Sequence, residues 1–312
     1  MRRAFIVTML FVSNIAYAGP ELTAAIENVR TTCGNISAEL NDMKKMAGIT
    51  TAVTTVATVS GGVGFGAGVA KTKADKELSQ TEQIVEELKA AGAKQVTSLE
   101  MFYETFADAL GETGTVKGQD YAAQLRAKKD KLMQKSKNLG NLRTGTLAVA
   151  TATNIAGAVM SGTNKVKGDL KQQIDECLTA VKTLSNVRMQ ARMDGGATDT
   201  DLARAENIIR ACDAWTTVDI TPINNRSKGA TVSSGIGAGL GLAGTITSAS
   251  ANSDGVRKGD DAKREKNLNT AANVLAGGTT VASATATIFN ATQINANKRA
   301  ATVADQCEGA LR

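Results

Sequence analysis

The chain has 312 residues, with 30 Gly, 2 Pro, 10 aromatic residues, no His and a formal net charge of +6. The absence of histidine excludes a histidine general base, a Ser/His/Asp or Cys/His nucleophile and a histidine metal ligand. Few aromatic residues argue against stacking platforms for bases or sugars. The sequence therefore predicts no enzyme, no metal site, no cofactor and no small-molecule substrate. Because proline is nearly absent, the abundant glycine does not indicate loops.

Residues 1–18 have the pattern of a secretory signal peptide. Two arginines precede an apolar run at 4–15, and Ala16-Tyr17-Ala18 forms a small-x-small cleavage site before Gly19. An uncleaved membrane anchor would need a longer apolar span. We expect a protein of the bacterial cell envelope, periplasmic or secreted, with outer-membrane association left open. The mild positive charge of the remaining chain argues against nucleic acid as a partner.

An apolar seam at helical spacing runs without a slip from Leu22 to Gly68 and predicts one helix of about 50 residues. Further seams predict helices around 85–110, 121–139, 202–212 and 303–311, with Asp199 or Thr200 as the N-cap of the helix at 202–212. The seam at 166–184 predicts the lower part of another helix, which begins before residue 166. Alternating runs that would indicate strands are absent. We therefore expect an all-α protein.

Export favours disulfide bonds among the four cysteines, which are Cys33, Cys177, Cys212 and Cys307. No pair has the close spacing of a zinc knuckle or a redox Cys-x-x-Cys motif. Each cysteine lies on an apolar helical seam, where it can face a partner helix. Four buried free thiols are the alternative.

Four uncharged segments rich in small residues recur, at 48–70, 145–164, 229–252 and 271–297. A cysteine precedes the first and third segments and another follows the second and fourth, which suggests a duplicated plan. We expect a first half at 19–195, with an inserted helical pair at about 71–140, and a second half at 196–312. Each half would fold as a long antiparallel hairpin in an elongated helical bundle, with Cys33 paired to Cys177 and Cys212 to Cys307. Coincidence of composition is the alternative to duplication.

Glycine costs about 1 kcal/mol per residue relative to alanine inside a helix, so the glycines of the first and third segments need a compensating role. Close packing of helices in water is one role; small-x-x-x-small contacts between membrane helices are another. The residues concerned are Gly61, Gly62, Gly64, Gly66, Gly68, Gly235, Gly237, Gly239, Gly241 and Gly244. We favour close packing in water, because the segments also contain Thr, Ser and Asn and because a charged connector follows Ser253.

A basic stretch within 126–137 is a candidate contact for an anionic surface. It comprises Arg126, Lys128, Lys129, Lys131, Lys135 and Lys137. The simpler interpretation is a solvated helix face that pairs with Glu82, Glu86 and Glu87.

The sequence thus predicts an exported, non-enzymatic structural or interaction protein of the cell envelope, which acts through helix–helix contacts and is stabilised by disulfides. A protein partner or self-association is expected, and membrane contact is left open. The alternative is a membrane-inserting, pore-forming helical protein with glycine-zipper hairpins.

Overall fold

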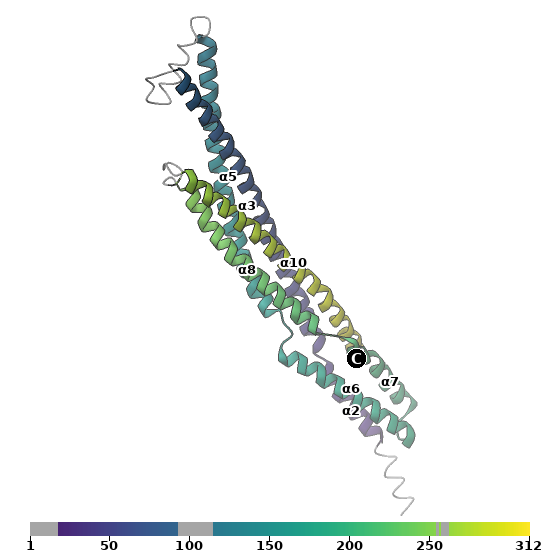
Figure 1. Cartoon of the computed structure of the whole chain (residues 1–312). Helices are drawn as coiled ribbons and strands as arrows, with labels where there is room; N and C mark the ends of the chain where they lie inside the picture. Colours follow the sequence, from purple (N-terminus) through teal and green to yellow (C-terminus); the bar gives the residue numbers. More distant parts are fainter. Residues whose placement is uncertain (1–17, 93–114, 254–255, 257–261) are drawn as a thin grey trace, which may run out of the picture. The chain divides into compact units, whose positions relative to one another are not determined.

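The computed structural model describes residues 18–92, 115–253, 256 and 262–312, so residues 1–17 of the predicted signal peptide lie outside the described part. All regular structure in the described part is helical, which confirms the predicted all-α bundle (Figure 1). The elements are α2 (Ala18–Cys33), α3 (Ile36–Gly92), α5 (Thr115–Thr163), α6 (Gly168–Asp194), α7 (Asp199–Asp213), η1 (Ala214–Thr217), α8 (Thr221–Asn252) and α10 (Ala262–Leu311).

The chain divides into two compact units. Unit 1 comprises Met1–Val53, Ala156–Ser233 and Thr285–Arg312, and unit 2 comprises Thr54–Ile155 and Ser234–Ala284. The long helices α3, α5, α8 and α10 each contribute to both units. Each unit therefore contains stretches of both sequence halves.

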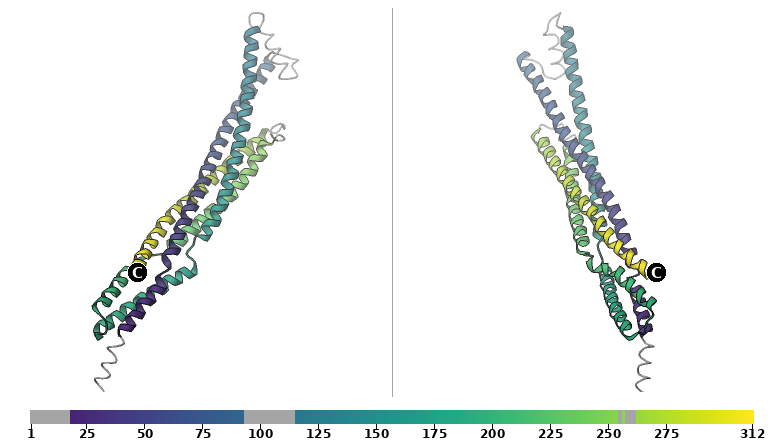
Figure 2. Two further views of the ribbon diagram at one scale, coloured as in Figure 1. Left: turned by 180° about the vertical axis from the view of Figure 1, so that it is seen from behind. Right: turned by 90° about the vertical axis from the view of Figure 1, so that its right-hand side faces the viewer.

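Unit 1 has a core of large apolar side chains. Within it α2 packs against α6 and α6 against α7, and these helices lie side by side in Figures 1 and 2. The core includes Leu22, Ile36, Leu184 and Ile208, together with the only tryptophan, Trp215, which is 2% exposed. Burial of such side chains stabilises this unit by the ordinary hydrophobic effect.

Within the described residues, unit 2 is a bundle of four helices, made by parts of α3, α5, α8 and α10 that run beside one another (Figure 2). Its interior is filled mainly by small and polar residues rather than by large apolar ones. Close approach of the helices replaces bulky side chains here, so dispersion between backbones and small side chains supplies the packing.

The predicted single helix from Leu22 to Gly68 is wrong in one respect, because α2 ends at Cys33 and α3 begins at Ile36. At Gly34, between them, a Cβ atom would lie 2.7 Å from the carbonyl oxygen of Arg30, so only glycine fits this turn. The seam nevertheless stays buried on both sides of the turn, from Leu22 in α2 to Leu40 in α3.

Three further boundaries differ from the sequence prediction. Residues 71–92 continue α3 and 115–139 begin α5, so the described parts of the predicted inserted pair are extensions of longer helices; residues 93–114 lie outside the described part. A break at 164–167 separates α5 from α6. The N-cap of α7 is Thr198, whose hydroxyl accepts a hydrogen bond from the backbone N–H of Asp201 at 3.1 Å.

Candidate functional site

Two disulfides close the core of unit 1, and they have the predicted pairing. Cys33 in α2 is bonded to Cys177 in α6, with 5.0 Å between the Cα atoms. Cys212 in α7 is bonded to Cys307 in α10, with 4.5 Å between the Cα atoms. All four cysteines are buried. Each bond therefore ties together helices that are about 100 or more residues apart in the chain, which restricts the unfolded state strongly.

The two disulfides are also neighbours. The Sγ atoms of Cys33, Cys177 and Cys307 lie within 4.8 Å of one another. This is the spacing of a metal-binding group, but all three sulfurs are already used in disulfides. The cluster is therefore a covalent clamp at the centre of the unit 1 core.

Six of the ten glycines singled out in the sequence lie where two helices of unit 2 approach closely. A Cβ atom at Gly61 would lie 3.3 Å from the Cα of Thr280 in α10, and one at Gly241 would lie 2.5 Å from the hydroxyl of Thr151 in α5. The six are Gly61, Gly64, Gly68, Gly237, Gly241 and Gly244. A larger residue at these positions would require the facing side chain, or the facing helix itself, to move.

The other four glycines do not take part in such close contacts. No neighbouring atom lies within 4 Å of a Cβ built at Gly66, Gly235 or Gly239, and at Gly62 the nearest atom is 3.9 Å away. The sequence could not separate the two sets, because both recur at similar spacing in the same segments.

A buried cationic network in unit 2 was not found by the sequence analysis. The Arg143 side chain donates hydrogen bonds to Ser248 Oγ at 2.8 Å, Asn273 Oδ1 at 3.0 Å and Asn269 Oδ1 at 2.9 Å. Burial lowers the pKa of Arg143, and the nearby charge of Asp75 opposes this shift. The guanidinium thus joins α5 to both α8 and α10.

A second buried cation, Lys71, lies in the same network. Its Nζ contacts Asp75 Oδ2 at 2.7 Å and Glu265 Oε1 at 3.3 Å, although the lysine side chain itself is fully buried. Asp75 also accepts a hydrogen bond from the hydroxyl of Ser136 at 2.5 Å. Buried charges with such partners hold helices in one register.

The uncharged segments of unit 2 have an inverted distribution of polarity. In 54–70, 145–155, 234–252 and 271–284, the buried positions hold Gly, Ala, Ser, Thr and Asn, with Leu147 as the only large apolar residue among them. The exposed positions of the same segments are all apolar or glycine, apart from Thr55 and Ser250. The large exposed side chains, here called the outer apolar set, are Val56, Val59, Val63, Phe65, Val69, Val149, Ile155, Ile236, Leu242, Ile246, Val274 and Val281.

The exposure of the outer apolar set is substantial. Val59, Val274 and Val281 are 61%, 69% and 67% exposed. Soluble proteins rarely expose large apolar surface without a partner for it. Together with the inverted interior, these side chains are the strongest functional signal in the described structure.

The predicted basic stretch lies on the first part of α5. Arg126, Lys128, Lys131, Lys135 and Lys137 are exposed, whereas Lys129 is partly buried and pairs with Glu82 in α3 at 3.3 Å. Side chains of Glu86 and Glu87 lie outside the described residues. The stretch therefore includes one cross-helix ion pair and a largely solvated face.

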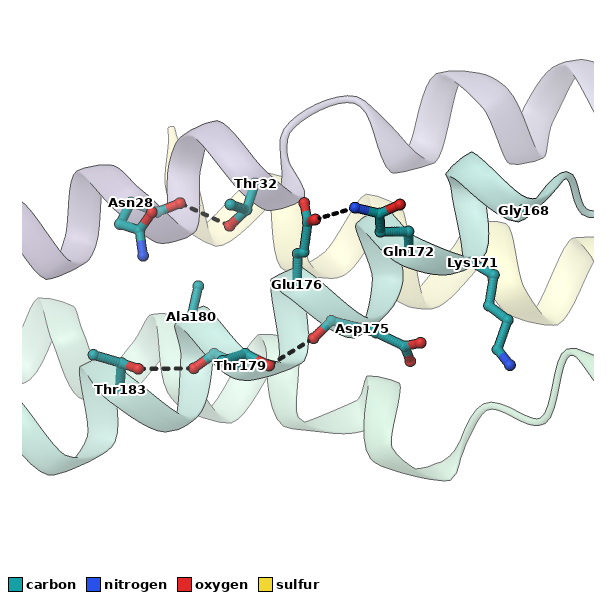
Figure 3. Close-up of a pocket in the computed structure, with 10 residues that line it drawn as sticks. All are labelled: Asn28, Thr32, Gly168, Lys171, Gln172, Asp175, Glu176, Thr179, Ala180 and Thr183. Atoms are coloured by element: carbon teal, nitrogen blue, oxygen red, sulfur yellow. Dashed lines mark hydrogen bonds between the residues drawn. The ribbon is translucent and has the colours of Figure 1, made fainter.

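A shallow groove of about 540 Å³ lies between α2 and α6 in unit 1 (Figure 3). Its polar groups bond mainly within their own helices; for example, Gln172 donates to Glu176 at 2.8 Å and Thr179 donates to the carbonyl of Asp175 at 2.9 Å. Most of its lining residues are exposed to solvent. The groove thus lacks the convergent buried polar groups that are typical of a ligand or catalytic site.

No protein-family model, no curated protein and no solved structure matches this chain.

Proposed function

We propose that this protein is an exported, non-enzymatic interaction protein of the bacterial cell envelope, which works through contacts between its long helices and is stabilised by two disulfides. The observation that carries the proposal is the pair of adjacent, buried disulfides in the core of unit 1. Such bonds persist in oxidising compartments, outside the reducing cytosol. The signal-peptide pattern of residues 1–18 supports the same compartment.

The non-enzymatic part of the proposal is supported by the chemistry of the described side chains. Histidine is absent from the chain. The buried charged groups Arg143 and Lys71 are held by polar partners from other helices. The buried cysteines are all in disulfides. These groups stabilise contacts between helices. This agrees with the proposal that the protein works through helix–helix contacts rather than through catalysis.

Trapping of free thiols in intact bacteria tests this proposal. We expect the four cysteines of the full chain to resist alkylation in cells and to react only after reduction and denaturation. The matched control is the same chain without residues 1–18, which should stay in the cytosol with its cysteines reduced. If the full chain carries reduced cysteines in growing cells, the proposed compartment is wrong.

A further inference from the structure

The outer apolar set calls for something that covers it, and the distribution of its residues indicates whether protein or lipid does so. Its members come from all four helices of unit 2, so they point outward around the bundle rather than along one flat face. A second copy of the chain would cover one side of such a bundle, whereas lipid covers every side. We propose that the hydrocarbon of a phospholipid bilayer surrounds the outer apolar set, and that each of the four uncharged segments crosses the bilayer.

The small and polar residues inside unit 2 support the proposal that lipid surrounds it. In a bilayer no hydrophobic force distinguishes the inside of a bundle from the outside, so small and polar residues gather between the helices and large apolar residues face lipid. In unit 2, Asn154 donates to the hydroxyl of Ser283 at 2.8 Å inside the bundle, while Ile155 faces outward. The helices of a water-soluble bundle typically turn their stripe of large apolar residues toward the core instead.

The partly exposed threonines are compatible with hydrocarbon. Thr153, Thr245 and Thr280 each donate the hydroxyl hydrogen to a carbonyl of their own helix, at 2.8–2.9 Å. A hydroxyl that is satisfied within its own helix can face lipid at low cost. Polar composition therefore lowers the mean hydropathy of these segments without giving them a polar outer face.

This explains why hydropathy alone is a weak guide for this chain. By length and composition, one helical stretch of the described part, Gly19–Gln83, is apolar enough to cross a membrane. Only 33% of its most apolar window is buried, so most of that window faces outward rather than into a core. The other three segments carry more Ser, Thr and Asn, many of which the fold turns inward.

The lengths of the segments fit a bilayer. Each whole uncharged segment, at 48–70, 145–164, 229–252 and 271–297, has at least 20 residues, of which unit 2 holds only a part. At about 1.5 Å per residue such a helix spans roughly 30 Å, the thickness of the hydrocarbon core. Charged residues flank the segments, as Lys45 and Lys71 do for the first and Lys266 and Lys298 for the fourth. The charged connectors therefore need not enter the hydrocarbon.

The positions of the cysteines are consistent with four crossings. Cys33 precedes the first segment, Cys177 and Cys212 lie between the second and third, and Cys307 follows the fourth. With four crossings these three regions share one side of the bilayer, and the connectors after the first and third segments, which contain no cysteine, share the other. All four disulfide-bonded cysteines thus lie on the side where we propose that export delivers them; the inference rests on the proposed function in this respect.

Alkaline extraction of bacterial membranes tests the inference on the full chain. We expect the chain to stay in the membrane pellet after carbonate washing and to float with phosphatidylethanolamine/phosphatidylglycerol liposomes after reconstitution. The triple variant Val59→Lys, Ile246→Lys, Val281→Lys should reduce the membrane-retained share by roughly tenfold, because each lysine would sit in hydrocarbon.

The matched control is the triple variant Thr183→Lys, Met189→Lys, Met193→Lys, whose sites are exposed on α6 in unit 1. It should leave membrane retention unchanged. Circular dichroism in detergent establishes that both variants keep their helicity, which is expected because all six sites are exposed.

Three results would overturn the inference: a wild-type chain that is extracted as a soluble monomer, a soluble oligomer in which copies cover the outer apolar set, or an outer triple variant that stays fully in the membrane. In each case oxidised cysteines in the thiol-trapping experiment would leave the proposed export intact. Reduced cysteines in a membrane-retained chain would instead overturn the proposed function alone.

Discussion

Arg143 shows how a single residue can organise the interior of unit 2. Its guanidinium is fully buried and is held by side-chain oxygens from α8 and α10. In the sequence Arg143 stands at the boundary between a basic stretch and an uncharged segment, where an exposed side chain is the ordinary expectation. Its burial follows from the neighbouring Ser and Asn residues, which converge on it only when the helices assemble.

Removal of the guanidinium should destabilise the protein strongly. Arg143→Met leaves the acceptors on Ser248, Asn269 and Asn273 without their donor, so we expect the free energy of unfolding to fall by about 3 kcal/mol. Denaturant unfolding of the purified chain, followed by circular dichroism, measures this change. The matched control is Lys137→Met on the exposed face of α5, which should change stability by less than about 0.5 kcal/mol. Equal effects of the two substitutions would contradict the structural role of Arg143.

At the scale of helices, the seams predicted most elements but not their ends. Spacing of three and four residues identified the buried stripe of α2 and α3, because that spacing places side chains on one helical face. The turn at Gly34 was missed, since an isolated glycine is tolerated within many helices and leaves the stripe in register. Likewise, the seam of α6 did not reveal the break at 164–167.

Glycine substitutions separate packed positions from free ones on α3. A Cβ at Gly61 would lie 2.9 Å from the hydroxyl and 3.3 Å from the Cα of Thr280, whereas nothing lies within 4 Å of a Cβ at Gly66. We expect Gly61→Ala to lower the free energy of unfolding by about 1 kcal/mol or more through overpacking. Gly66→Ala should raise it by about 0.5–1 kcal/mol through helix propensity. Thermal unfolding of the two variants and the wild type measures both changes. If both substitutions stabilise the protein, α3 and α10 are less closely packed than the structure indicates.

At the scale of the whole molecule, the disulfides join distant parts of the chain at one point in unit 1. Cys33, Cys177 and Cys307 are 144 and 130 residues apart along the chain, yet their sulfurs lie within 4.8 Å of one another. The pairing within each half followed from the order of cysteines and uncharged segments. Contact between the two disulfides did not follow, because it depends on α10 meeting α2 and α6 in one core.

This contact predicts different outcomes for two cysteine variants. Cys212→Ala frees the thiol of Cys307 beside the Cys33–Cys177 bond. The Cys307 thiolate can attack either sulfur, forming a new disulfide and releasing the other cysteine as a thiolate. We expect a mixture of disulfide species by peptide mapping.

Cys307→Ala is the matched control for this exchange. It frees Cys212 instead, whose sulfur lies outside the group of three. We expect the Cys33–Cys177 bond alone. A single species in both variants would argue against exchange at this cluster.

The sequence by itself determined the all-α class and the four uncharged segments and favoured the observed disulfide pairing, because helical periodicity and the order of cysteines are local or linear properties of the chain. Tertiary structure alone decided which residues of those segments face inward, that Arg143 and Lys71 are buried, and that Val and Ile side chains form the outer surface of unit 2. The physical reason is that a stripe of small residues and a neighbouring stripe of valines both recur at helical spacing on the same helix, so the spacing alone does not say which stripe faces inward. Only the positions of the other three helices, which leave room mainly for small side chains between them, determine which stripe becomes the interior.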